Sequence, residues 1–205
     1  MALGSGAGVI GSNQLTNPRV VCATGHFCPE GTASPRANPC APGTYSPDTD
    51  NSKQEECLVC PAGRYCTGGG AIPSGWCADG YYCPTGSSTA QAVPCPAGTF
   101  FSSAVHDNGA LRGARAVTDC RVCPLGNYCP LASAAARPCP AGSYGREPGL
   151  QAAAPSGSVT GCAACPAGWK CPASGLIDPV ECGLGTYSAA GASSCSPCAL
   201  DHYCD

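Results

Sequence analysis

The sequence predicts a small disulfide-rich fold, mostly irregular with short β-ribbons and almost no helix, arranged as an elongated tandem-repeat rod. Three observations predict it. The 205 residues include 20 Cys, 28 Gly and 21 Pro. Leu, Ile, Val, Phe and Met together make up only about an eighth of the chain, well below what a globular domain needs for a hydrophobic core. A short cysteine motif recurs ten times, which is typical of stacked repeat proteins.

Every odd-numbered cysteine opens the same motif, C-x-x-G-x-[Y/F]. Two of the ten copies deviate: Trp169 comes one position early, with Lys170 in the aromatic slot, and Asp201 replaces the glycine of the last copy. We expect the glycine to turn the backbone through a positive φ and the aromatic residue to supply the largest buried area of its unit. Units 1 to 10 run from one opening cysteine to the next, and these are Cys22, Cys40, Cys60, Cys77, Cys95, Cys123, Cys139, Cys165, Cys182 and Cys198. The expected structural aromatics are Phe27, Tyr45, Tyr65, Tyr82, Phe100, Tyr128, Tyr144, Trp169, Tyr187 and Tyr203.

Every even-numbered cysteine closes a unit, either directly after the aromatic slot (a short unit) or after a polar loop (a long unit). We favour consecutive pairing, because the isolated short unit Cys77/Cys83 adds two cysteines without disturbing its neighbours. A crossed arrangement, such as Cys40–Cys60 with Cys57–Cys66, remains the alternative. Disulfides would stabilise the fold by lowering the entropy of the unfolded chain. The predicted pairs are Cys22–Cys28, Cys40–Cys57, Cys60–Cys66, Cys77–Cys83, Cys95–Cys120, Cys123–Cys129, Cys139–Cys162, Cys165–Cys171, Cys182–Cys195 and Cys198–Cys204.

The chain divides into one segment without cysteines and four groups of repeats. Residues 1–21 are expected to be a tail or a strand that joins subunits, since Val9-Ile10 and Arg19–Val21 could pair with a neighbouring copy. The groups are 22–66 (repeats 1–3), 67–129 (repeats 4–6), 130–171 (repeats 7–8) and 172–205 (repeats 9–10).

The cysteine content indicates an oxidising compartment, so the protein is expected to be secreted, extracellular or on the cell surface. The first 21 residues contain no basic region and no continuous apolar segment, so a secretory signal is expected to lie outside this sequence or to have been removed. The chain ends one residue after Cys204, which indicates a cut through a longer array. A charged fraction of 11% and a net charge of −3 argue against nucleic-acid binding, and no apolar run is long enough to span a membrane.

Three strings carry a resemblance to a known family: CAPGTYS (residues 40–46), CPAGTFFS (95–102) and CGLGTYS (182–188). They resemble the ephrin-receptor-like cysteine-rich repeat and, more distantly, the modules of tumour-necrosis-factor receptors. The resemblance extends over roughly residues 22–204. It implies a spacer or interaction module of a receptor ectodomain, a matrix protein or a protist surface protein of the mastigoneme type, and it brings no catalytic residues.

The C-x-x-C pairs and the histidines are the first candidates for chemistry. Two C-x-x-C pairs can form a zinc ribbon, but here each pair is the closing cysteine of one unit followed by the opening cysteine of the next. The three histidines, His26, His106 and His202, lie in different units. We therefore expect no catalytic residue, no metal and no cofactor. The pairs are Cys57/Cys60, Cys120/Cys123, Cys162/Cys165 and Cys195/Cys198.

Asp48-x-Asp50-x-Ser52, with Glu55 and Glu56 beyond it, is faintly similar to a calcium-binding loop. It lacks the central glycine of that pattern, so we interpret it as an exposed acidic loop.

The loops are rich in Ser, Thr and Pro, which is compatible with O-linked glycans on an extracellular rod. Unmodified polar loops are the alternative. The candidate glycosylation sites are Ser46, Thr49, Ser52, Ser87, Ser88, Thr89, Ser156, Ser158 and Thr160.

These observations predict a non-catalytic structural module of an extracellular or cell-surface filament or matrix, which associates with itself and with other surface glycoproteins. The alternative is a ligand-binding segment of a cysteine-rich receptor ectodomain. That function requires an exposed cluster of aromatic residues or arginines. The candidates for such a cluster are Phe101, Leu111, Arg112 and Arg115.

Overall fold

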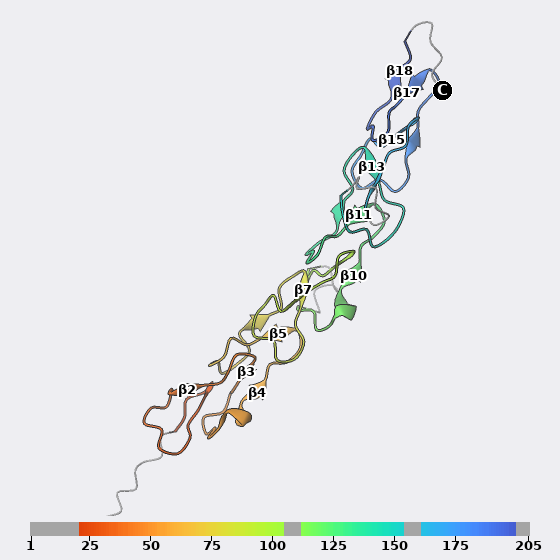
Figure 1. Cartoon of the computed structure of the whole chain (residues 1–205). Coiled ribbons are helices and arrows are strands. Elements are labelled where there is room, and N and C mark those ends of the chain that lie inside the picture. Colours follow the sequence, from red (N-terminus) through yellow and green to blue (C-terminus); the bar gives the residue numbers. More distant parts are fainter. Residues whose placement is uncertain (1–20, 105–111, 154–160, 200–205) are drawn as a thin grey trace, which may run out of the picture.

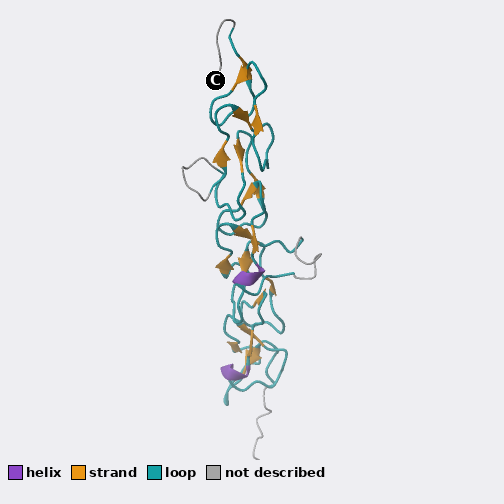
Figure 2. Ribbon diagram, turned by 90° about the vertical axis from the view of Figure 1, so that its right-hand side faces the viewer, coloured by secondary structure: helices purple, strands orange, loops and turns teal. Residues whose placement is uncertain are grey.

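A computed structural model describes residues 21–104, 112–153 and 161–199. These residues form a long, narrow rod, and the chain runs from one end of it to the other (Figure 1). Loops and turns make up most of the rod, with short strands along its length (Figure 2). The predicted disulfide-rich repeat fold with short β-ribbons and almost no helix is confirmed. No helix of the described residues is long and apolar enough to cross a membrane.

The repeating element is an antiparallel ribbon of two strands with two residues each. The first strand holds the aromatic slot and the residue before it, and the second holds the two residues before the next opening cysteine. The ribbons are β1 (His26–Phe27) with β2 (Asn38–Pro39), β3 (Thr44–Tyr45) with β4 (Leu58–Val59), β5 (Arg64–Tyr65) with β6 (Gly75–Trp76), β7 (Tyr81–Tyr82) with β8 (Val93–Pro94), β9 (Thr99–Phe100) with β10 (Arg121–Val122), β11 (Asn127–Tyr128) with β12 (Arg137–Pro138), β13 (Ser143–Tyr144) with β14 (Ala163–Ala164), β15 (Trp169–Lys170) with β16 (Val180–Glu181), and β17 (Thr186–Tyr187) with β18 (Ser196–Pro197). In the described residues, two short 3-10 helices precede closing cysteines, η1 (Gln54–Glu56) and η3 (Val117–Asp119).

Each ribbon starts from a turn at the motif glycine. In units 1 to 9 this glycine has a φ between 72° and 86°, a left-handed conformation that side chains disfavour. Its carbonyl accepts the N–H of the next opening cysteine, as in the bond of 2.9 Å from Cys60 to Gly43. The same bond occurs in every described unit from Gly25 to Gly185. The turn therefore fixes the position of one unit's cysteine relative to the glycine of the unit before it.

Backbone hydrogen bonds also join each unit to the next along the rod. The N–H of Gly43 in unit 2 donates to the carbonyl of Cys66 in unit 3 at 2.8 Å, and the N–H of Cys66 donates to the carbonyl of Ser87 in unit 4 at 3.0 Å. Together these bonds form an inter-unit ladder that needs no hydrophobic layer. The glycine bond recurs from Gly25 to Ser46, Gly63 to Cys83, Gly80 to Phe101, Gly98 to Cys129, Gly126 to Gly145, Gly142 to Cys171 and Gly168 to Ser188.

Units contact the second unit along the rod as well as their immediate neighbours. Gly63 of unit 3 lies against Gly113 of unit 5, where a Cβ built on Gly63 would be 2.7 Å from the carbonyl oxygen of Gly113. Gly142 of unit 7 lies closer still to Gly191 of unit 9, since a Cβ built on Gly142 would be 2.4 Å from the carbonyl oxygen of Gly191. Each unit contributes only one ribbon of two-residue strands to the length of the rod. A loop of one unit can therefore reach past the next unit to the unit after that. The seven motif glycines from Gly25 to Gly142 are thus sites of close backbone approach as well as turns.

The described residues contain nine disulfides, and each joins the opening cysteine of a unit to the closing cysteine of the same unit. The Cα–Cα separations of 5.7 to 5.9 Å are ordinary for disulfides. These bonds are the consecutive ones, and the crossed pairs Cys40–Cys60 and Cys57–Cys66 do not occur. The tenth expected pair, Cys198–Cys204, includes a residue outside the described part of the chain. Covalent cross-links therefore close individual units and, in the described rod, leave the joints between units to the ladder.

Small apolar clusters cover some of these disulfides. In unit 5 the disulfide packs with Phe101 and Ala114, both fully buried, and Tyr82 of the preceding unit packs against them. Unit 7 repeats this arrangement with Leu150 and with Tyr128 of unit 6. An aromatic residue of a short unit therefore shields the disulfide of the long unit that follows.

The expected structural aromatics are not equally buried. Those from Phe27 to Tyr144 are half-buried, whereas Trp169 and Tyr187 are 37% and 47% exposed. Trp169 occupies the first strand position of its ribbon, and Lys170 fills the aromatic slot. The fully buried aromatic of unit 5 is Phe101, not the expected Phe100. Tyr203 lies outside the described residues.

The close approach at Gly142 yields a matched pair of variants. Gly142 and Gly191 have nearly equal φ values of 84° and 79°, but a Cβ on Gly142 would clash with the carbonyl oxygen of Gly191, whereas a Cβ on Gly191 meets nothing within 4 Å. We expect Gly191→Ala to cost about 1 kcal/mol from backbone strain alone. Gly142→Ala should cost about 3 kcal/mol more, because the ladder must shift.

Native-state hydrogen exchange of the oxidised chain measures both costs. The amide of Cys165, which donates to Gly142 at 2.9 Å, should exchange much faster in Gly142→Ala than in Gly191→Ala. Equal protection in the two variants would contradict the close approach.

Candidate interaction surfaces

The cysteines of the C-x-x-C pairs are held in disulfides. Cys57 is bonded to Cys40 and Cys60 to Cys66, so the two cysteines of this pair belong to different bonds. Cys198 is also disulfide-bonded, and no described cysteine is free. A thiolate is the species that binds zinc or attacks a substrate, and these bonded sulfurs cannot supply one.

The described histidine is engaged locally. His26 is half-buried, and its Nδ1 lies 3.0 Å from the carbonyl oxygen of Thr24, to which it donates a hydrogen bond in the matching tautomer. His106 and His202 lie outside the described residues. Within the described ranges, no group of three or more His, Cys, Asp or Glu side chains could hold a metal ion.

The acidic loop, residues 48–56, is folded around a buried hydroxyl. Ser46 is inaccessible to solvent, and its Oγ accepts hydrogen bonds from the side-chain amide of Asn51 at 2.7 Å and from the N–H of Asp48 at 3.1 Å. Asp48 and Asp50 are exposed at the surface of this loop. The Ser46 end of the loop is therefore ordered by uncharged groups, while the carboxylates of Asp48 and Asp50 face solvent.

Glu56 has a structural role in the same loop. Its carboxylate accepts the N–H of Ser52 at 2.5 Å and the hydroxyl of Ser52 at 3.1 Å, closing the turn that contains η1. In unit 5, Asp119 likewise accepts the N–H of Arg115 at 2.7 Å, beside η3. The hydrogen bond from the backbone of Ser52 is the main cause that lowers the pKa of Glu56 below its ordinary value of 4.5.

The lowered pKa of Glu56 gives a pH-dependent prediction. A carboxylate with a lowered folded-state pKa stabilises the fold above its unfolded pKa, and this contribution is lost as the pH falls through the folded-state pKa. The amide of Ser52 should therefore be protected from hydrogen exchange at neutral pH and lose protection below about pH 4.5, after correction for intrinsic rates. Glu56→Gln should show no such step, and the amide of Cys60, which donates to the backbone carbonyl of Gly43, serves as an internal reference without a titrating acceptor. A step that persists in Glu56→Gln would contradict this assignment.

Two of the expected glycosylation sites are not accessible in the folded chain, which corrects the sequence-based expectation. Ser46 is buried as described, and Ser87 is 8% exposed with its hydroxyl donated to the carbonyl of Pro84 at 2.7 Å. Thr49, Ser52 and Thr89 are exposed and Ser88 is partly exposed, although the hydroxyl of Ser52 is engaged with Glu56. Ser156, Ser158 and Thr160 lie outside the described residues.

An arginine and a tryptophan are stacked on the ribbon of unit 3. Arg64 of β5 pairs with Trp76 of β6, and the guanidinium carbon of Arg64 lies 3.8 Å from the centroid of the indole ring. This is a close cation–π contact, which holds the two side chains in one orientation. Trp76 remains 42% exposed, so one side of the pair is offered to solvent.

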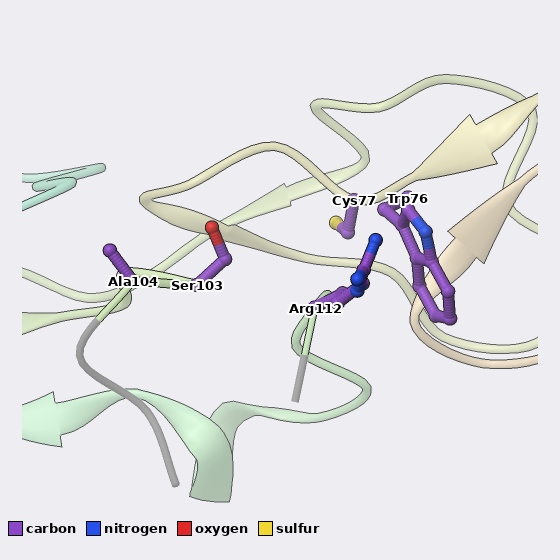
Figure 3. A pocket seen from close by; sticks show the side chains of 5 residues that line it. All are labelled: Trp76, Cys77, Ser103, Ala104 and Arg112. Atoms are coloured by element: carbon purple, nitrogen blue, oxygen red, sulfur yellow. The ribbon is translucent and has the colours of Figure 1, made fainter. Parts of the chain in front are cut away.

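Arg112 joins this pair across a shallow cavity of 450 Å³, which is lined by Trp76, Cys77, Ser103, Ala104 and Arg112. Figure 3 shows the Arg112 side chain beside the indole, with Ser103 and Ala104 farther away along the cavity. The segment that carries Arg112 is held in place by the hydrogen bond of 2.9 Å from the N–H of Cys83 to the carbonyl of Ala114. Arg115, on the same segment, lays its stem over Gly63.

Sequence reasoning found only part of this surface. Arg112 and Arg115 are exposed, as the receptor hypothesis requires, but Phe101 is fully buried and cannot contact a ligand, and Leu111 lies outside the described residues. Arg64 and Trp76 were missed. The available signal was that Trp76 stands directly before an opening cysteine, where most units have proline, valine or another small residue.

No model of a known protein family matches the chain, and no curated protein sequence is significantly similar to it.

Proposed function

We propose that this chain is a non-catalytic structural module of an extracellular or cell-surface filament or matrix, and that it acts as a stiff rod. The observation that carries this proposal is the inter-unit ladder, in which every motif glycine from Gly25 to Gly168 donates a hydrogen bond to the next unit. Stacked repeats that contact one another through a continuous interface form extended scaffolds whose length grows with the number of units.

The chemistry of the surface supports a structural rather than a catalytic role. The cysteines of the described residues are bonded, and the one described histidine is hydrogen-bonded to its own turn. The acidic side chain with a shifted pKa, Glu56, caps a loop. These groups are engaged in holding the repeats together, so the proposal assigns no reaction to them.

The disulfides also support an extracellular location. Disulfides persist in oxidising compartments and are rare in the cytosol, and nine within the described residues is a high density. We further propose kinship with the ephrin-receptor-like cysteine-rich repeats, on the strength of the C-x-x-G-T-Y-S strings, and a place in a mastigoneme-like filament. O-linked glycans, where present on the folded rod, are assigned to accessible hydroxyls such as those of Thr49 and Thr89.

A receptor ectodomain segment is the second candidate function, and the surface around Trp76 favours it. Tryptophan and arginine are the residues that most often dominate binding energy at protein interfaces. In that case a partner protein of a different sequence would occupy the surface.

Imaging and mass measurement of the oxidised chain test the structural proposal. Negative-stain images should show thin rods that associate into longer or thicker assemblies, and the intact mass of protein from its native source should include sugar increments. Compact particles, or rods that stay single at every concentration, would overturn the proposal.

Mechanical extension tests how the rod bears load. Each disulfide bypasses the residues it encloses, so an oxidised rod pulled from its ends should extend only through the segments between units. Reduction under load should release steps of about 15 Å for the six-residue separations, and of about 40, 55, 75 and 80 Å for the separations of 13, 17, 23 and 25 residues. A variant with Cys77→Ser and Cys83→Ser should lose one short step and no other. Steps with lengths that match crossed pairs would contradict the load path.

A further inference from the structure

We propose that the surface formed by Arg64, Trp76, Arg112 and Arg115, the basic–aromatic face, binds the acidic loop of a second copy of this chain and holds rods side by side. The inference rests on the proposed structural function, since it names the contact through which the rods associate.

The face gathers positive charge that the described rod does not neutralise. It contains three of the ten Lys and Arg residues of the chain. None of the three forms an ion pair with an acidic side chain of the described residues, and the one described ion pair joins Arg146 to Asp178. Two carboxylates lie beside the face: that of Asp119 accepts the N–H of Arg115 at 2.7 Å, and that of Asp79 accepts the N–H of Ser103 at 2.9 Å at the cavity. Among the described residues, three arginines thus stand against two carboxylates that are held by backbone N–H groups, which leaves an excess of positive charge around an exposed indole.

The face is also preorganised. Arg64 is fixed against Trp76 by the cation–π contact, and the strand register places both on one ribbon. Arg112 and Arg115 lie on a segment that the backbone bond from Cys83 to Ala114 holds in place. Binding to a surface that is already ordered loses little conformational entropy, which favours a specific contact.

The acidic loop has the complementary charge and is likewise preorganised. Residues 48–56 contain Asp48, Asp50, Glu55 and Glu56 against a single cation, Lys53. Asp48, Asp50 and Glu55 are exposed, and none of them pairs with a described cation. The hydrogen bonds to the buried hydroxyl of Ser46 and to the carboxylate of Glu56 hold the loop in one conformation. The three exposed carboxylates of the loop are then available to pair with the three arginines of the face.

The acidic loop that meets the face belongs to another copy in this proposal, because the loop and the face of one chain lie at different levels of its rod. The loop belongs to unit 2, whereas the face is built from units 3 and 5, and no described ion pair joins them. Bringing them together within one chain would break the inter-unit ladder between Gly43 and Cys66. In a pair of antiparallel copies related by a two-fold axis, the acidic loop of each copy would bind the basic–aromatic face of the other.

A charge swap on the full oxidised chain tests the proposal. Arg112→Glu with Arg115→Glu reverses the face, and Asp48→Lys with Asp50→Lys reverses the loop; all four side chains are exposed, so the fold should be retained. In analytical ultracentrifugation at low salt, each double variant alone should associate about tenfold or more weakly than the wild type. An equimolar mixture of the two should recover association. In a mixed pair the reversed face of one copy meets the reversed loop of the other, and the native loop of the first meets the native face of the second.

Matched controls separate this contact from general charge effects. Arg36→Glu with Arg137→Glu makes the same change in net charge at two exposed arginines away from the face, and it should associate like the wild type. With Trp169→Phe, Trp76 is the single tryptophan, so its fluorescence should change on association. Raised salt should dissociate the rods, since the paired charges are screened.

The possible failures are distinguishable. Rods that associate equally in the wild type and in both reversed variants would overturn the proposed contact while leaving the structural function standing. A face variant that loses binding to an acidic polysaccharide, with self-association unchanged, would assign the face to a glycan and also overturn the proposal. Particles that are not rods would overturn the proposed function itself.

Discussion

The close approach of backbones at the motif glycine is the constraint on which the rest of the rod depends. At Gly43, for example, the carbonyl accepts from Cys60 and the N–H donates to Cys66. The missing side chain leaves room for the backbone of Gly86, two units further on. One residue type thus satisfies both of its polar backbone groups and sets the spacing of three successive units. A side chain at any motif glycine from Gly25 to Gly142 would therefore force apart the backbones of units two apart.

The disulfides and the inter-unit ladder together stabilise the folded rod, as a hydrophobic core stabilises a globular protein. The disulfides close units and restrict the unfolded chain, but in the described rod they do not connect one unit to another. The ladder connects the units, but its bonds would be weak if the units themselves were open. Aromatic residues such as Tyr82 and Tyr128 link the two systems, because each covers the disulfide of the next unit.

The sequence predicted those features that have a local signature. Cysteine spacing identified the units, the ribbons and the glycine turns. It could not predict the ladder, because the accepting carbonyls belong to residues as different as Asn51, Ser87 and Ala114, and a backbone carbonyl leaves no trace in the sequence. Ala132 has a φ of 58° at a position where the corresponding loops of other units have glycine. The cysteine pattern gave no indication of this left-handed residue. The pairing of Arg64 with Trp76 required the strand register, and the burial of Phe101 in place of Phe100 required the packing around unit 5.

The pairing of each opening cysteine with the closing cysteine of the same unit has a consequence for biosynthesis. Eight cysteines alone allow 105 connectivities, and a longer array allows vastly more. In the nine described disulfides the partner of an opening cysteine follows 6 to 25 residues later, so both members of a bond leave the ribosome within moments of each other. Oxidation in the order of synthesis would then reach the native set without reshuffling. Arrays of any length could be made with the same fidelity, because the search for a partner never extends beyond a single unit.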